Sequence, residues 1–162
     1  MTNSLNFNFN QLAPNSYDNF FLNEISNDNS KKIVIYGANK TGQLALCAFK
    51  KLNINVSYVM EEDDGKIGNE FFGIKILSPS DILNIDKNAL IFISHPQIEK
   101  GLNTLLNLGF KNIYSCIDLW NLHNFKTQES LIFLKNLDPT HEKILGHIDY
   151  HKYNVLKYLG KL

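Results

Sequence analysis

Gly37, Asn39 and Gly42, in the stretch GANKTG, have the types and the spacing that could bind a phosphate. The two glycines occupy the first and third glycine places of the dinucleotide-binding pattern Gly-x-Gly-x-x-Gly, and Asn39 stands in the middle place. After a strand, such a turn leaves backbone N–H groups at the start of a helix, and these groups favour an anion. Asn39 would either displace that anion or hydrogen-bond to it.

We therefore predict a nucleotide-binding loop with this composition: Gly37, Ala38, Asn39, Lys40, Thr41 and Gly42. An alternative is that Gly37 and Gly42 only allow a tight turn and close packing of the helix. The loop is not a Walker A motif, because Gln43 and Leu44 follow Gly42 where lysine and then serine or threonine are required.

Two further positions follow predicted strands. Glu61 comes directly after the apolar run that ends at Met60, where a dinucleotide-binding fold places the acidic residue that contacts a ribose. Ser94 and His95 follow the run ALIFI, and we expect both to line a crevice beside the glycine turn. His95 is a minor catalytic candidate as a general acid or base; alternatively, Ser94 or His95 caps a helix that begins at Pro96.

No metal site is predicted. His147 and His151 are four residues apart, but Gly146 and Asp149 interrupt the helix that would place both imidazoles on one face. The two cysteines in the chain form no metal-binding or redox motif. We interpret both as small buried apolar side chains.

Short apolar runs alternate with helical patterns in the middle of the chain. The predicted strands cover 32–36, 55–60, 73–77, 89–93 and 112–115, and the predicted helices cover 42–52, a segment starting at SPSDIL, and 96–108 with a stop at Gly109. This alternation is typical of a parallel sheet with right-handed crossovers. We predict an α/β, Rossmann-like three-layer domain over 31–118, with a parallel sheet of strand order 3-2-1-4-5.

The flanking segments have different patterns. Residues 1–30 are rich in asparagine and serine, with a short docked helix expected over about 16–25. Residues 119–162 have helical periodicity, and we expect them to form a short helical tail that covers a sheet edge, forms a dimer surface or leads into a linker.

Composition argues against several classes of protein. Lysine plus arginine equals aspartate plus glutamate at 16 each, so no net field attracts nucleic acid or an anionic membrane surface. The apolar runs are too short to span a bilayer, and the amino terminus lacks a secretory pattern, so we expect a cytoplasmic protein with no membrane span.

The sequences IVIYGANKTGQLALCAFKKL, NVSYVMEEDDGKIGNEFFGIKILSPSDIL and ALIFISHPQIEKGLNTLLNLGFKNIYS together resemble a known kind of domain. They are similar to the Rossmann-like domain that precedes catalytic domains in bacterial sugar-modifying enzymes, as in PglD-like sugar acetyltransferases and FkbM-type methyltransferases. The resemblance implies that Gly37, Ala38, Asn39 and Gly42 face a nucleotide diphosphate. It further implies that Glu61 faces the ribose or base, and that Ser94 and His95 stand at the mouth of the pocket.

The expected function is a non-catalytic module that binds a nucleotide or nucleotide-sugar in glycan or lipopolysaccharide modification, as the N-terminal part of a sugar methyltransferase in one version. We expect no catalysis by this chain alone; its partners would be a small nucleotide ligand, an attached catalytic domain or a second copy. One alternative is an interaction or oligomerisation domain with a degenerate pocket. A second is a small oxidoreductase that uses NAD.

Overall fold

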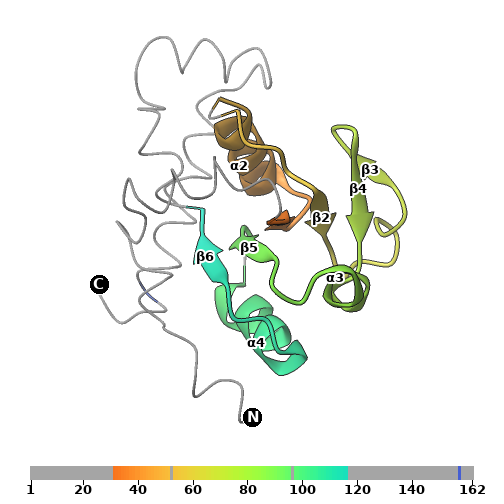
Figure 1. The fold of residues 1–162 in the computed structure, drawn as a ribbon, viewed down its shortest axis with the longest axis vertical. Coiled ribbons are helices and arrows are strands. Elements are labelled where there is room, and N and C mark those ends of the chain that lie inside the picture. The colour runs from red at the N-terminus through yellow and green to blue at the C-terminus, as the bar shows by residue number, and fades with distance from the viewer. Residues whose placement is uncertain (1–30, 52, 96, 117–156, 158–162) are drawn as a thin grey trace.

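The apolar runs of the sequence form the strands of one six-stranded sheet (Figure 1). The computed structural model describes residues 31–51, 53–95, 97–116 and 157. Five strands run parallel to one another: β1 (Ile33–Tyr36), β2 (Tyr58–Met60), β4 (Ile74–Leu77), β5 (Leu90–Ile93) and β6 (Ile113–Ser115). The spatial order of the whole sheet is β3-β4-β2-β1-β5-β6. The order predicted for the five parallel strands is therefore confirmed.

The sixth strand corrects the prediction of a purely parallel sheet. β3 (Glu70–Phe71) pairs antiparallel with β4, so the domain is α/β with a mixed, mostly parallel sheet. The two strands are joined by Phe72 and Gly73, which both have positive φ, at 50° and 82°. Positive φ at both central residues is typical of a two-residue hairpin turn. The prediction missed β3 because two residues give no periodicity from which to recognise a strand.

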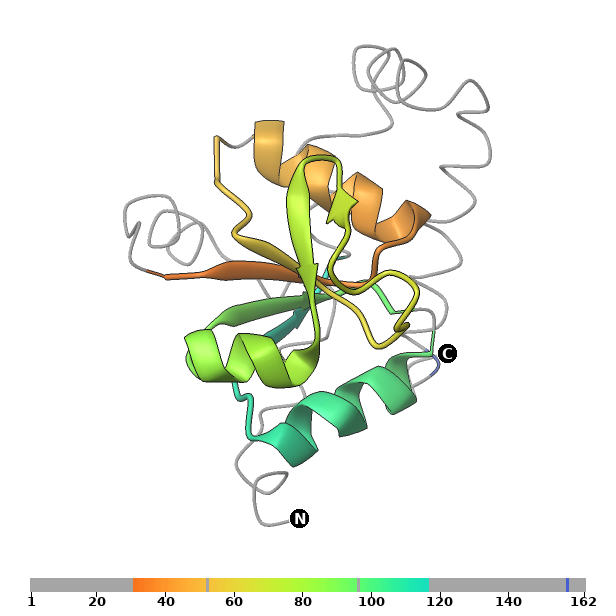
Figure 2. The same ribbon diagram turned by 90° about the vertical axis from the view of Figure 1, so that its right-hand side faces the viewer.

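Helices cover both faces of the sheet. Figure 2 shows α2 (Lys40–Lys51) on one face, with α3 (Pro79–Ile85) and α4 (Ile98–Leu108) on the other. The predicted signals at Ser78 and Gly109 are confirmed: the Ser78 side chain accepts a hydrogen bond from the amide of Asp81, and Gly109 ends α4 in a left-handed conformation.

Two predicted helix starts were wrong by two residues. α2 begins at Lys40 instead of residue 42, because Asn39 supplies its N-cap oxygen. α4 begins at Ile98 instead of residue 96, and its N-cap is Gln97, which makes no side-chain capping bond. Neither Ser94 nor His95 is therefore the cap of this helix.

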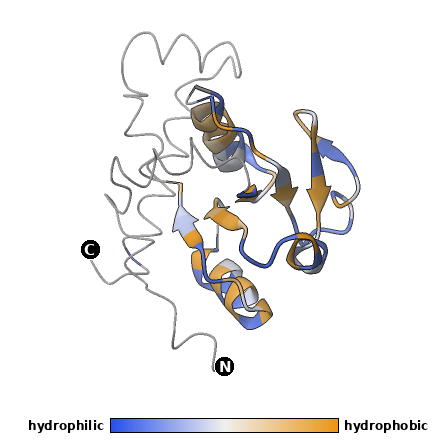
Figure 3. Ribbon diagram, in the orientation of Figure 1, coloured by the Kyte–Doolittle hydropathy of each residue, from blue (hydrophilic) through white to orange (hydrophobic). Residues whose placement is uncertain are grey.

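The core lies between the inner strands β1 and β5 and the helices. Every residue of β1 and β5 is buried, which explains why these strands read as continuous apolar runs rather than as alternating patterns. Phe49 from α2 packs edge-to-face on Phe92 from β5, with ring centroids 4.8 Å apart. Figure 3 shows the apolar colour along β5 at the centre of the domain.

The predicted segments 1–30 and 119–162, with their helices, lie outside the described residues, apart from residue 157. None of the helices in the described residues has the length and hydropathy of a membrane-spanning segment.

Candidate functional site

The glycine turn lies at the carboxyl end of β1, as predicted, and Asn39 organises it. The Asn39 side-chain oxygen accepts a hydrogen bond from the amide of Gly42 at 2.8 Å, and its backbone carbonyl accepts one from the amide of Gln43 at 2.9 Å. The amide of Gly37 donates to the Met60 carbonyl at the end of β2, at 3.0 Å. The chain itself therefore satisfies the Gly42 amide, one of the donors expected to face an anion.

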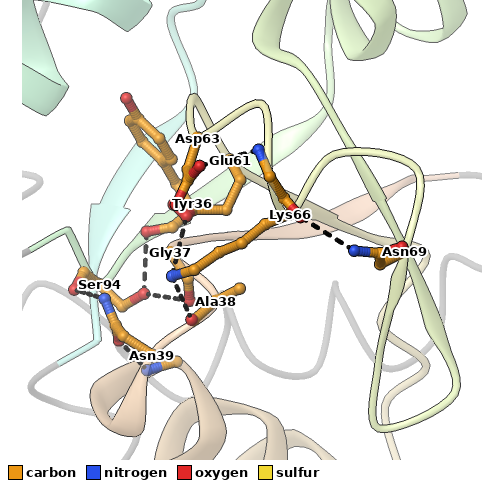
Figure 4. Close-up of polar contacts among 11 residues, drawn as sticks. Tyr36, Gly37, Ala38, Asn39, Glu61, Asp63, Lys66, Asn69 and Ser94 are labelled. Atoms are coloured by element: carbon orange, nitrogen blue, oxygen red, sulfur yellow. Dashed lines mark hydrogen bonds and ion pairs between the residues drawn. The ribbon is translucent and has the colours of Figure 1, made fainter.

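Ser94 joins the loop after β5 to the glycine turn (Figure 4). Its hydroxyl lies 2.8 Å from the carbonyl oxygen of Tyr36 and 3.1 Å from that of Gly37, and its own carbonyl accepts from the side-chain amide of Asn39 at 3.2 Å. The residue is only 1% exposed. These bonds tie together the two loops that diverge at the topological switch point of the sheet.

The two glycines are required by the packing of this loop. A Cβ atom on Gly42 would lie 2.0 Å from the carbonyl oxygen of Gly37, and one on Gly37 would lie 2.5 Å from the Ser94 hydroxyl. Gly37 also has a φ of 132°, which residues with a side chain rarely adopt. The fold thus uses both glycines for close backbone approach, whatever ligand the loop binds.

Lys66 contacts the turn from the loop between β2 and β3 (Figure 4). Its ammonium nitrogen lies 3.1 Å from the carbonyl oxygen of Ala38 and 3.4 Å from a carboxylate oxygen of Glu61. The Lys66 side chain is 43% exposed and that of Glu61 12%. The site therefore has a partly exposed cation held directly over the first loop, beside the predicted ribose-binding carboxylate.

The sequence analysis gave no role to Lys66, which follows a run of acidic residues in the loop between β2 and β3. Asp63 closes a turn in this loop: its carboxylate accepts from the amide of Gly65 at 2.9 Å, and its carbonyl accepts from the amides of Lys66 and Ile67. The spacing of Asp63 and Gly65 is a turn signal that could have shown the chain folding back here. It gave no indication of where the lysine side chain would lie.

His95 packs against Tyr36 at the same end of the sheet. The ring centroids are 5.3 Å apart, and the Tyr36 hydroxyl donates a hydrogen bond to Glu62. The amide of Gln97 donates to Nδ1 of His95 at 3.0 Å, so the neutral ring carries its proton on Nε2.

Burial controls the protonation of this pair. It lowers the pKa of His95, against the opposing effect of Glu62, and so favours the neutral imidazole. Burial and the hydrogen bond to Glu62 raise the pKa of Tyr36, so that its hydroxyl stays protonated. The arrangement can present one neutral N–H donor to a ligand.

The predicted residues gather at one end of the sheet but differ in availability. Gly37, Asn39 and Ser94 contact one another directly, and Glu61 reaches the turn through Lys66. Ala38 and Thr41 are buried, and Lys40 is exposed. Among the described residues no group of three or more His, Cys, Asp or Glu side chains could hold a metal ion.

The fold and this loop define the class of protein: an α/β domain with a mostly parallel sheet and a glycine turn after its first strand. Residues 29–113 match the model of the C2185-like N-terminal family, and the chain belongs to that family. Comparison with curated proteins found no significant match.

Proposed function

We propose that this domain is a non-catalytic module that binds a nucleotide or nucleotide-sugar and serves glycan or lipopolysaccharide modification. The proposal combines the geometry at the carboxyl ends of β1 and β2 with the resemblance to the Rossmann-like N-terminal domains of PglD-like and FkbM-type enzymes. An attached or separate catalytic domain would then carry out the chemistry.

The position of Lys66 is the observation that carries the proposal. Its ammonium group has three N–H donors: one donates to the carbonyl oxygen of Ala38, and a second can face the Glu61 carboxylate, which lies at ion-pair distance. The third can point to an anion in front of the first turn of α2, where the helix dipole also favours negative charge. Lys66 would thereby supply the charge that the glycine turn lacks, because Asn39 already occupies the Gly42 amide.

Glu61 and His95 offer groups that suit the rest of a nucleotide. One carboxylate oxygen of Glu61 pairs with Lys66, and the other can accept hydrogen bonds from ribose hydroxyls. The Nε2–H group of His95 can donate to a sugar or phosphate oxygen on the opposite side of the glycine turn.

Calorimetry on the whole chain tests the proposal with UDP-sugars, CDP-linked compounds, NAD and S-adenosylmethionine. We expect saturable binding of a ligand that contains a diphosphate, and about tenfold weaker binding for Lys66→Met, because a charge-assisted hydrogen bond is lost. Lys87→Met is the matched control, since Lys87 is exposed and precedes β5 at the opposite end of the sheet. Saturation by none of these ligands at millimolar concentration would refute the proposal.

A second candidate function is an interaction domain with a degenerate pocket. The hydrogen bond of Asn39 to the Gly42 amide and its bond to Ser94 favour it, because both use polar groups that a ligand would otherwise engage. Light scattering with and without residues 120–162 tests it. A monomer in both forms would argue against an oligomerisation role.

A further inference from the structure

A groove runs along one side of α2. It has a volume of about 350 Å³ and lies between α2 and the hairpin formed by β3 and β4. Its apolar lining consists of Leu46, Cys47, Ile54, Val56, Phe72 and Ile74. Volumes of this order and a mostly apolar lining are typical of sites for small molecules.

Phe72 projects at the hairpin turn on one side of the groove. Its exposed fraction is 61%, the larger of the two values for exposed large apolar side chains among the described residues. Its φ of 50° is uncommon for a bulky residue, because the side chain crowds the backbone in that region. Its ring packs edge-to-face on Phe71, with centroids 4.8 Å apart. An aromatic face is thus held in position beside the groove at a conformational cost.

The polar lining is sparse and positively charged. Gln43 and Asn55 contribute amide groups, and Lys50 is the charged residue among those that line the groove. Lys50 is exposed, and no carboxylate of the described residues forms an ion pair with it. A ligand with one negative charge would therefore complement the groove.

We propose that this groove binds a small molecule with a flat apolar body and one carboxylate group. The ring system packs between Phe72 and the apolar side chains of α2 and β4, and the carboxylate pairs with Lys50. A second copy of the chain is a poorer fit. A stable interface buries about 800 Å² of surface on each partner, far more surface than the walls of this one groove offer.

The test is a titration of the isotope-labelled full chain with 1-naphthoate, monitored by the chemical shifts of the backbone amides in NMR spectra. We expect saturable shifts confined to α2, residues 54–56 and the hairpin. The neutral isostere 1-naphthalenemethanol should bind about fivefold more weakly, because it forms no ion pair with Lys50. Equal affinity for the two probes, or shifts scattered over the surface, would overturn the proposal.

Matched variants assign the two contacts. Phe72→Ala should weaken both probes about tenfold, whereas Ile85→Ala, at the other exposed apolar side chain, should change neither. Lys50→Gln should weaken only 1-naphthoate, and Lys75→Gln, at an exposed position of β4, should leave both unchanged. Lys50→Gln changes a surface residue and should fold, so it still tests the ligand contact if Phe72→Ala does not fold.

Two measurements distinguish this groove from the nucleotide site and from an interface between copies. Lys66→Met should leave 1-naphthoate binding unchanged. The groove proposal can therefore fail while the nucleotide proposal stands, and the nucleotide proposal can fail while the groove proposal stands. A fall in molar mass by light scattering on Phe72→Ala would show that the groove is an interface between copies, and would overturn the small-molecule proposal.

Discussion

The first turn of α2 is closed by contacts within the protein, whereas the side of α2 next to the β3/β4 hairpin is open to solvent. At the first turn, Gly42 and Asn39 pack against Gly37 and Ser94, and polar groups are satisfied internally. Along the side next to the hairpin of β3 and β4, an apolar groove stays open, with Phe72 exposed beside it and Lys50 without an ion partner among the described residues. A sequence motif identified the first region, and no motif identified the second.

The difference shows that a glycine motif indicates a close approach of backbone atoms, and that a bound ligand is a separate inference. In this loop the approaching groups are the protein's own carbonyl and hydroxyl oxygens. In the proposed function, the positive charge for a phosphate comes from Lys66, which lies on a separate loop and contacts the carbonyl oxygen of Ala38.

Gly42→Ala should have the largest effect, and it tests how tightly the first turn is packed. Its Cβ would meet the Gly37 carbonyl at 2.0 Å, so the backbone must shift, and we expect a loss of about 3 kcal/mol of unfolding free energy or more. Urea denaturation measures this loss. The control Gly65→Ala, whose nearest contact is 3.2 Å to an exposed side chain, should cost far less. A similar loss in both variants would mean that the turn is not specially packed.

Asn39→Gly sharpens the same comparison by restoring the middle glycine. The chain should lose about 1 kcal/mol of stability, since the bond from Asn39 to the Ser94 carbonyl disappears while glycine is a tolerable N-cap. Nucleotide affinity should rise, because the Gly42 amide becomes available to phosphate. Thermal unfolding and calorimetry give the two values. An unchanged affinity would show that this amide does not contribute to binding.

His95 gives the prediction with a pH dependence. Burial lowers its pKa in the folded protein below the ordinary value of about 6.5, so the unfolded chain binds the proton more readily. Its contribution to stability is complete above about pH 6.5 and is lost as the pH falls below that value.

Lowering the pH from about 7.5 to about 5.5 should therefore reduce the unfolding free energy of His95→Gln less than that of the parent chain. Urea denaturation at the two pH values gives the difference. Glu61, Glu62 and Lys100 also act on the imidazole, so the comparison uses the variant and not the absolute slope. Parallel pH profiles for both proteins would contradict the assignment.

Lys66→Met should have the smallest effect on stability. The ion pair with Glu61 is partly exposed, and such pairs contribute about 0.5 kcal/mol. Chemical denaturation should therefore show almost no change for a variant that binds nucleotide poorly. A loss of several kcal/mol would instead make Lys66 a structural strut for the loop between β2 and β3.

The sequence was sufficient for most of the fold. Apolar runs and helix signals predicted five strands and their spatial order. The signal was strongest at β1 and β5, where every residue is buried. β3 was missed, since its two residues are defined only by pairing with β4. The family model over 29–113 agrees with the part of the chain that carries this pattern.

The site was predictable only in part. Gly37, Asn39 and Ser94 were placed at the correct ends of the strands, because topology alone brings those ends together. The direction of each side chain was not predictable: the Ser94 hydroxyl contacts the carbonyl oxygens of Tyr36 and Gly37, and Lys66 contacts the glycine turn from the loop between β2 and β3. Such contacts depend on how the loop between β2 and β3 folds, and local patterns do not encode that.

The short antiparallel strand β3 has a consequence for how the molecule behaves in a crowded solution. It covers the outer flank of β4 with only two residues before the chain turns away. A long flat flank would invite strands from other molecules to add to the sheet and begin an aggregate. At this flank the row of backbone groups is too short to template such growth, so this edge of the mostly parallel sheet carries little risk of fibre formation.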